Sequence, residues 1–126
     1  MRKNISSGAP WEDRVGYSRA VKINNVIEVS GTAPVRGGQV VGDNAYQQTR
    51  VCIEIIQEAL EAAGASLDDV VRTRMFVTDI SQWEEIGRAH GEFFSQIKPA
   101  TAMVEVSRLI DPKMMIEIEA TAVIAG

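Results

Sequence analysis

Cysteine and histidine are nearly absent from the sequence, which has only Cys52 and His90 among its 126 residues. A zinc site built from thiolates and imidazoles needs several such side chains, and a single cysteine cannot form a disulfide within the chain. The sequence therefore predicts a protein of a reducing compartment, with no resident metal.

Long apolar runs are also missing. No segment approaches the roughly 20 apolar residues that a membrane-spanning helix needs. The basic start, Met1-Arg2-Lys3, is followed by polar residues and not by the apolar stretch of a secretory signal. We therefore expect a cytoplasmic protein that has no membrane partner.

Positive charge is in short supply. Lysine and arginine number 13 against 17 aspartates and glutamates, which gives a formal net charge of −4. Nucleic-acid binding depends largely on basic side chains that neutralise phosphates, so the sequence predicts no nucleic-acid partner.

The remaining composition is that of a globular chain. Hydrophobic residues make up 45% and charged residues 24%, without a repeat, a low-complexity tract or a linker. These values predict a single domain that spans residues 1–126.

Apolar spacing and turn residues predict an α+β chain. Strands are expected over residues 17–23, 26–30, 40–41, 70–78, 102–106 and 115–125. The first two would form a hairpin at Asn24-Asn25. Helices are expected over residues 45–63, behind a cap at Asp43-Asn44, and from a capping box at Ser81–Glu84 to about Phe94.

This order of elements predicts a mixed sheet. Helices between strands permit parallel crossovers, whereas the Asn24 turn gives an antiparallel pair. Both helices would cover the face of the last strand that carries Ile116 and Ile118. The opposite face carries Glu117 and Glu119, and it is too large and too mixed for ordinary surface. We therefore expect the chain to oligomerise through the sheet.

Two single residues allow more than one interpretation. His90 could act as a general base near neutral pH, but no local motif places a nucleophile beside it, so a solvent-facing helix histidine is favoured. Cys52 falls on the apolar stripe of the first helix, which favours a buried structural thiol over a reactive one.

The glutamates of the last two strands also allow several interpretations. They could share acid/base work or form a hard-metal site, but strand glutamates that are solvated or paired across the sheet are favoured. The residues concerned are Glu105, Glu117 and Glu119, with Arg72, Arg74 or Arg108 as partners. The Ser30-Gly31 strand end could hold an anion through its amides, although a plain strand end is favoured from the residues alone.

A series of short motifs resembles the RidA/YjgF family of reactive-intermediate deaminases, in the family's order and over nearly the whole chain. The motifs are Gly16-Tyr17, Val29-Ser30-Gly31, Gln48-Thr49-Arg50, Ala62-Ala63-Gly64, Val77-Thr78-Asp79-Ile80, Glu92-Phe93-Phe94, Pro99-Ala100, Val104–Leu109 and Ile116–Ala120. The resemblance implies a chorismate-mutase-like fold and a homotrimer with clefts between subunits. It also implies hydrolysis of 2-imino acids to 2-keto acids and ammonia, without a metal or organic cofactor.

The resemblance also assigns site residues. Tyr17 matches the pocket tyrosine, Ser30 and Gly31 match the strand end that contacts the ligand carboxylate, and Glu117 matches the glutamate that positions the attacking water. Thr101 stands where the deaminases carry an arginine that clamps this carboxylate. A threonine cannot make the bidentate contact of an arginine. The loss of such a contact costs about 1.5–3 kcal/mol, or roughly tenfold to hundredfold in binding.

Another cation could replace the missing arginine. Arg14 and Arg19 flank Tyr17, and Arg88 lies near His90. Arg19 shares the strand parity of Tyr17, so both side chains are expected on one face, and Arg19 is the preferred replacement.

Three functions remain open. The preferred one is hydrolytic deamination of small reactive imines or enamines, or a closely related hydrolase activity, at clefts between subunits. The second is a trimer that binds a keto or imino acid without catalysis. The third is an endoribonuclease, a label that some relatives carry, and the net charge of −4 argues against it.

Overall fold

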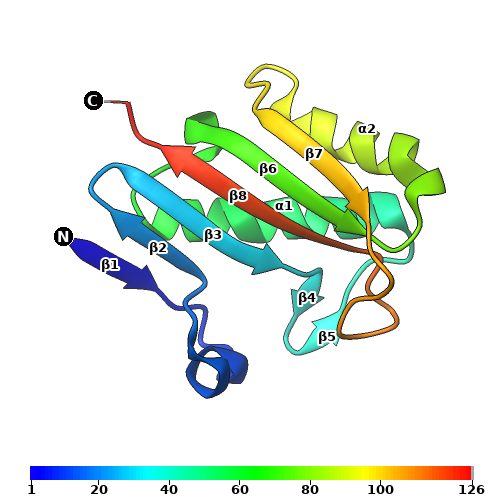
Figure 1. Ribbon diagram of the computed structural model, residues 1–126, viewed down its shortest axis with the longest axis horizontal. Coiled ribbons are helices and arrows are strands. Elements are labelled where there is room, and N and C mark those ends of the chain that lie inside the picture. Colours follow the sequence, from blue (N-terminus) through cyan, green and yellow to red (C-terminus); the bar gives the residue numbers. More distant parts are fainter. Residues whose placement is uncertain (126) are drawn as a thin grey trace.

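Six strands form one mixed sheet in the computed structural model, which describes residues 1–125 (Figure 1). In order across the sheet they are β1 (Arg2–Ile5), β2 (Ala20–Ile23), β3 (Val26–Thr32), β8 (Ile116–Val123), β6 (Val70–Val77) and β7 (Ala100–Glu105). Neighbours are antiparallel except β6 and β7, which are parallel. The two-residue strands β4 (Val35–Arg36) and β5 (Gln39–Val40) form a separate hairpin.

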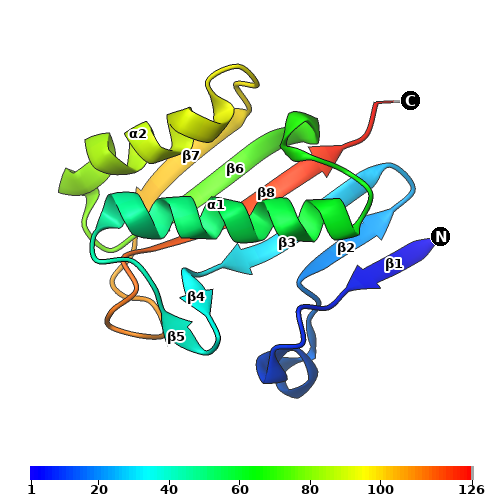
Figure 2. The same ribbon diagram turned by 180° about the vertical axis from the view of Figure 1, so that it is seen from behind.

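Both long helices, α1 (Ala45–Ala62) and α2 (Trp83–Phe94), lie on one face of the sheet (Figure 2). The side chains of β8 alternate, so Ile116 and Ile118 are buried beneath the helices and Glu117 and Glu119 lie on the other face, which we call the open face. The predicted α+β architecture, a mixed sheet with two helices on one face, is confirmed.

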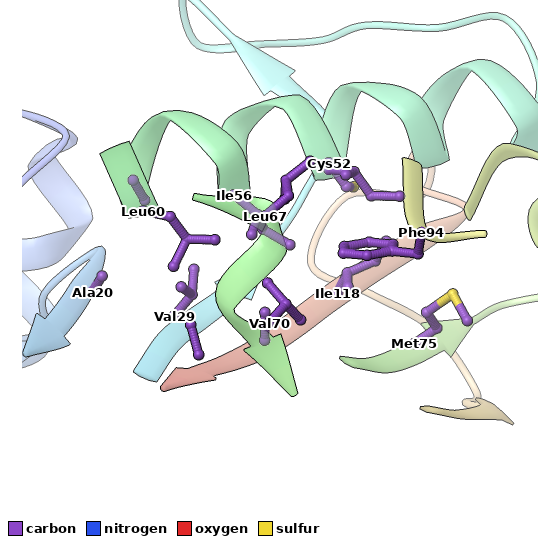
Figure 3. Close-up of a cluster of buried hydrophobic side chains, with 14 of the residues drawn as sticks. Ala20, Val29, Cys52, Ile56, Leu60, Leu67, Val70, Met75, Phe94 and Ile118 are labelled. Atoms are coloured by element: carbon purple, nitrogen blue, oxygen red, sulfur yellow. The ribbon is translucent and has the colours of Figure 1, made fainter. Parts of the chain in front are cut away.

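The hydrophobic core fills the space between α1 and the sheet (Figure 3). Cys52, Ile56 and Leu60 on the inner side of α1 are buried with Val29 of β3 and Ile118 of β8. Burial raises the pKa of the Cys52 thiol far above its ordinary value. Cys52 is therefore the inert structural thiol that the apolar stripe predicts.

Local turn and cap residues act largely as predicted. Asn24 adopts a left-handed φ of 54° between β2 and β3. The side chain of Asn44 accepts a hydrogen bond from the Gln47 amide at 2.8 Å and so caps α1. Gly64 follows the end of α1 with a φ of +86°, the conformation that a glycine after a helix provides most easily.

The start of α2 differs from the prediction. A 3-10 turn, Ile80–Gln82, precedes the helix, and the Asp79 carboxylate accepts from the Ser81 amide at 3.0 Å. The capping box expected from Ser81 is therefore wrong, because Asp79 bonds this turn through an Asx-type contact first. A complete capping box occurs instead at Ser66, before the 3-10 turn Leu67–Asp69.

Several elements near the chain start were not predicted. The exposed edge strand β1 has no apolar alternation, and a π-helical turn covers Glu12–Gly16. Strand β2 begins at Ala20, three residues later than predicted, and β7 begins at Ala100, two residues earlier. Within residues 1–125 no helix is long and apolar enough to cross a membrane.

Candidate functional site

The carboxylate of Glu117 lies directly against the backbone of Gly31. Strand β3 shifts its register against β8 between Val29 and Thr32, so Ser30 and Gly31 fall in an irregular stretch of the ladder. A Cβ atom built on Gly31 would lie 2.2 Å from Oε2 of Glu117. Glycine at this position therefore leaves room for the carboxylate, as is typical where another group approaches a strand closely.

Arg19, the residue before β2, forms hydrogen bonds with this irregular stretch of β3. Its Nη2 donates to the Gly31 carbonyl at 2.6 Å, and its own carbonyl accepts from the Ser30 amide at 3.0 Å. The Nε of Arg19 is buried and has no hydrogen-bond partner among residues 1–125. The structure therefore brings Arg19, Ser30, Gly31 and Glu117 together.

The surroundings of Glu117 hold the pKa of its carboxyl group above the ordinary value. Burial raises the pKa of Glu117, the charge of Glu119 raises it further, and Arg19 lowers it in part. Glu119 is itself paired with Arg74, whose Nη1 lies 3.8 Å from Glu119 Oε1. A carboxyl group with a raised pKa can take and return a proton nearer to neutral pH than an ordinary glutamate can.

Tyr17 and Ser30 line a shallow depression of about 530 Å³ beside this cluster. The Ser30 hydroxyl donates to the Ser18 carbonyl at 2.6 Å, which leaves the oxygen of Ser30 as an acceptor. Glu12 also lines the depression and is buried, with hydrogen bonds from Ser6 and Ser7. Burial alone would raise the pKa of Glu12, but the Ser7 and Ser6 hydrogen bonds outweigh it and lower the pKa.

Thr101 lies apart from the cluster within one chain. It pairs with Thr73 across β7 and β6, and its Oγ1 is 2.8 Å from Oγ1 of Thr73. Thr73 is on the buried face, opposite Ala120, whereas Glu117 is on the open face. A site that uses both Thr101 and Glu117 would have to combine residues of two chains.

His90 points inward and not toward solvent, so that expectation is wrong. Its Nε2 lies 2.9 Å from Oγ1 of the fully buried Thr73, and its ring centroid is 4.6 Å from that of Phe94. Residues 86, 90 and 94 follow one another at a spacing of four, which places His90 on the stripe of Ile86 and Phe94. Burial lowers the pKa of the His90 imidazole.

The other two candidate cations lie over aromatic rings. The guanidinium of Arg14 is 4.9 Å from the centroid of Trp11. The guanidinium of Arg88 is 4.0 Å from that of Tyr46, and it also pairs with Glu85 at 2.9 Å. Among the three arginines considered, Arg19 is the one that contacts the Gly31 backbone.

The three glutamates of the last two strands do not converge. Glu105 pairs with Val77, which lies on the buried face, and its carboxylate accepts from the Ile80 amide at 2.9 Å. The acid/base and metal interpretations that need Glu105 beside Glu117 are therefore wrong. No group of three possible metal ligands occurs within residues 1–125. The Arg74–Glu119 pair confirms cross-strand pairing for one of these glutamates.

Thr73 is the site-region residue that the sequence did not indicate. It is a threonine on the buried face of a strand, and its hydroxyl joins His90 to Thr101. The only sequence signal was a polar residue at a position that alternation assigns to the core, and that signal names no partner.

Comparison with known proteins gives consistent matches over almost the full length. Residues 9–124 match the family described as Endoribonuclease L-PSP. A RutC family protein from Pyrococcus abyssi is 41% identical over 109 residues, which cover 84% of this chain and 84% of the relative. A crystal structure from Mycobacterium tuberculosis, of a member of the YjgF/YER057c/UK114 family, has a TM-score of 0.92 and 48% identity and covers 98% of this chain and 100% of that one. The crystal structure of the YjgF gene product of Escherichia coli has a TM-score of 0.84 and 34% identity, with coverage of 96% and 98%.

Proposed function

The chain belongs to the RidA/YjgF family, also described as Endoribonuclease L-PSP, and from that membership we propose that it hydrolyses small reactive imines or enamines. The proposed substrates are 2-imino acids, the products are 2-keto acids and ammonia, and the reaction takes place in the cytoplasm. It requires a glutamate, a water molecule and contacts to an anion, and no metal or organic cofactor.

The contact between Glu117 and Gly31 is the observation that carries this proposal. Hydrolysis of an imine adds water to the C=N carbon, moves a proton to nitrogen and releases ammonia as the carbonyl forms. Glu117, with its raised pKa, can accept the proton of the attacking water and return it to the nitrogen. We assign the binding of the substrate carboxylate to Arg19 and the Ser30-Gly31 strand end, which the 2.6 Å bond from Arg19 Nη2 to the Gly31 carbonyl holds together.

We further propose that the working unit is a homotrimer assembled through the open face of the sheet. Apolar side chains remain exposed on this face, with Ile23 at 45%, Val26 at 37% and Val104 at 47% exposure. Since Thr101 and Glu117 lie on opposite faces of one chain, a cleft between chains would bring them together. Light scattering on the purified protein tests this: a mass of three chains is expected, and a monomeric mass would contradict it.

A trimer that binds a metabolite without catalysis is the second candidate. The observation in its favour is Thr101, which is neutral where the family's deaminases carry a carboxylate-clamping arginine. A ligand that binds only the folded state raises the melting temperature. Stabilisation by keto acids without turnover of any imino acid would therefore favour this second function.

A continuous assay of imine loss tests the proposed reaction. Purified protein should accelerate the loss of at least one of several 2-imino acids, and no acceleration with any of them would rule out deamination. The Thr101→Arg variant refines the result. A gain in hydrolysis of 2-iminopropanoate would show that the rest of the site is in place, whereas no gain would show that the pocket has diverged further.

A further inference from the structure

A hydroxyl relay joins His90 to the edge of the sheet. The Thr73 hydroxyl is fully buried and lies 2.9 Å from Nε2 of His90 and 2.8 Å from Oγ1 of Thr101. Thr101 is exposed on β7, the edge strand, and its Oγ1 lies 3.2 Å from the Pro99 carbonyl. The relay thus connects a half-buried imidazole to Thr101, an exposed residue on the edge strand.

The relay has only two complete arrangements, because the Thr73 hydroxyl carries one proton. In the first, His90 donates from Nε2 to Thr73, Thr73 donates to Thr101, and Thr101 donates outward. In the second, Thr101 donates to Thr73, and Thr73 donates to an unprotonated Nε2. Thr101 then offers only lone pairs to its surroundings.

A ligand at Thr101 selects between these arrangements. An ionised carboxylate only accepts hydrogen bonds, so it can bond Thr101 only in the first arrangement. Without ligand, the Pro99 carbonyl is the outward acceptor, at a longer distance than either bond of the relay. A bound carboxylate therefore favours the proton at Nε2 of His90. The neutral imidazole carries one N–H in both arrangements, on Nε2 in the first and on Nδ1 in the second. The change between them loses a proton from one nitrogen to solvent and gains one from solvent at the other, so the net charge of His90 stays the same.

We propose that Thr73 and His90 are positioning residues that orient the Thr101 hydroxyl as a donor to the carboxylate of the ligand, and that ligand binding places the proton on Nε2 of His90. This inference rests on the proposed function, which supplies a keto or imino acid as the ligand. It assigns to Thr101 a neutral, directional contact in place of the charged clamp of the family's deaminases.

The location of the imidazole proton can be read directly by nitrogen NMR. His90 is the only histidine, so the two ring nitrogens of ¹⁵N-histidine-labelled protein give signals that need no assignment between residues. Pyruvate is the probe, since it is a small 2-keto acid. Addition of pyruvate to the wild type should move Nε2 toward the protonated position. Thr101→Val should abolish this change and weaken pyruvate binding roughly tenfold or more.

Thr73→Val separates the relay from the final contact. It removes the buried hydroxyl but leaves Thr101, so the response of His90 should vanish. Pyruvate binding should weaken less than in Thr101→Val, roughly two- to fivefold, because an unrelayed hydroxyl is a weaker donor. Thr49→Val is the matched control. Thr49 is equally buried, but its hydroxyl donates to the Ala45 carbonyl in α1, so the response should persist.

The outcomes separate this inference from the proposed function. If the wild type hydrolyses imino acids and binds pyruvate while the proton position in His90 stays unchanged, the relay is overturned and the function stands. The same holds if Thr101→Val keeps the response. If the wild type neither turns over imino acids nor binds pyruvate, both are overturned. Thr101 is on the surface, so its variant keeps the test valid even if Thr73→Val does not fold.

Discussion

Glu117 and Gly31 are in such close contact that any side chain at position 31 would occupy the place of the carboxylate. The Cβ of an alanine would lie 2.2 Å from Oε2 and 3.0 Å from the carboxyl carbon of Glu117. The pair lies where β3 and β8 lose their regular register. The strand irregularity therefore sets the position of the one carboxylate to which we assign proton transfer.

Gly31→Ala should reduce activity much more than stability. The atoms that the new methyl would meet belong to the flexible end of Glu117, so the carboxylate can swing away at a cost of about 1 kcal/mol or less. Imine hydrolysis should fall about a hundredfold, because the displaced carboxylate no longer positions water. Gly87→Ala, in α2 with no atom near its new methyl, is the control and should keep full activity. Equal activity of Gly31→Ala and the wild type would show that this contact has no role.

The acid limb of the pH–rate profile should depend on Glu119. The pKa of Glu117 is raised from its ordinary value of 4.5, first by burial and then by the charge of Glu119. The carboxylate must be ionised to accept a proton, so activity should fall as pH drops through this raised pKa. Glu119→Gln removes the negative charge that helps to raise the pKa of Glu117. The pKa of Glu117 should therefore fall, and the acid limb should move to lower pH. A profile that does not move, measured as kcat/KM against pH, would argue against Glu117 as the proton acceptor.

Arg19→Met should weaken both the site and the fold. The variant leaves the Gly31 carbonyl without its 2.6 Å donor, at a cost of about 1–3 kcal/mol of unfolding free energy. Binding of pyruvate should fall roughly tenfold, because a cation beside the anion site is lost. Arg14→Met is the control, since Arg14 stacks on Trp11 and should leave both quantities near wild type. If Arg19→Met binds pyruvate normally, Arg19 does not replace the missing clamp.

His90 should make the fold less stable at mildly acidic pH. Burial lowers the pKa of His90 below its ordinary value of 6.5, so the unfolded chain binds a proton more readily than the folded chain. The stability contributed by the neutral imidazole is complete above pH 6.5 and is lost as pH falls through the lowered pKa. Denaturant unfolding at pH 7.5 and 5.5 should show a decrease in the wild type that is smaller in His90→Gln. An equal decrease in the unfolding free energy of both proteins would show that groups other than His90 cause the loss of stability.

Local signals were sufficient to predict most of the fold. The Asn24 turn, the Asn44 cap and the alternation of β8 depend on neighbours within a few residues, and each is confirmed. Strand β1 could not be predicted, because its polar residues owe their conformation to pairing with β2 and not to an apolar pattern. The start of α2 was missed because the Asp79 carboxylate accepts from both the amide and the hydroxyl of Ser81, so the Ser81 side chain does not cap the helix.

The site was predictable only in part, because it depends on contacts between distant segments. Strand parity predicted only that Arg19 shares a face with Tyr17, and the contact of Arg19 with the Gly31 carbonyl is visible in the structure alone. The four-residue spacing of Ile86, His90 and Phe94 indicates an inward His90, but nothing in α2 or β6 alone identifies Thr73 as its partner. A group of Glu105 with Glu117 was one interpretation, conditional on pairing of the last two strands, and it is wrong because β6 lies between β7 and β8.

The most direct test of the central claim is the rate of 2-imino acid hydrolysis by the wild type and by Glu117→Gln, assayed side by side. The variant keeps the size and shape of the side chain, but its amide cannot accept the proton of water. We predict that the wild type accelerates hydrolysis and that the variant, folded to the same melting temperature within a few degrees, loses that acceleration by a factor of about 10² or more. A wild type without acceleration, or a variant as fast as the wild type, would contradict the account.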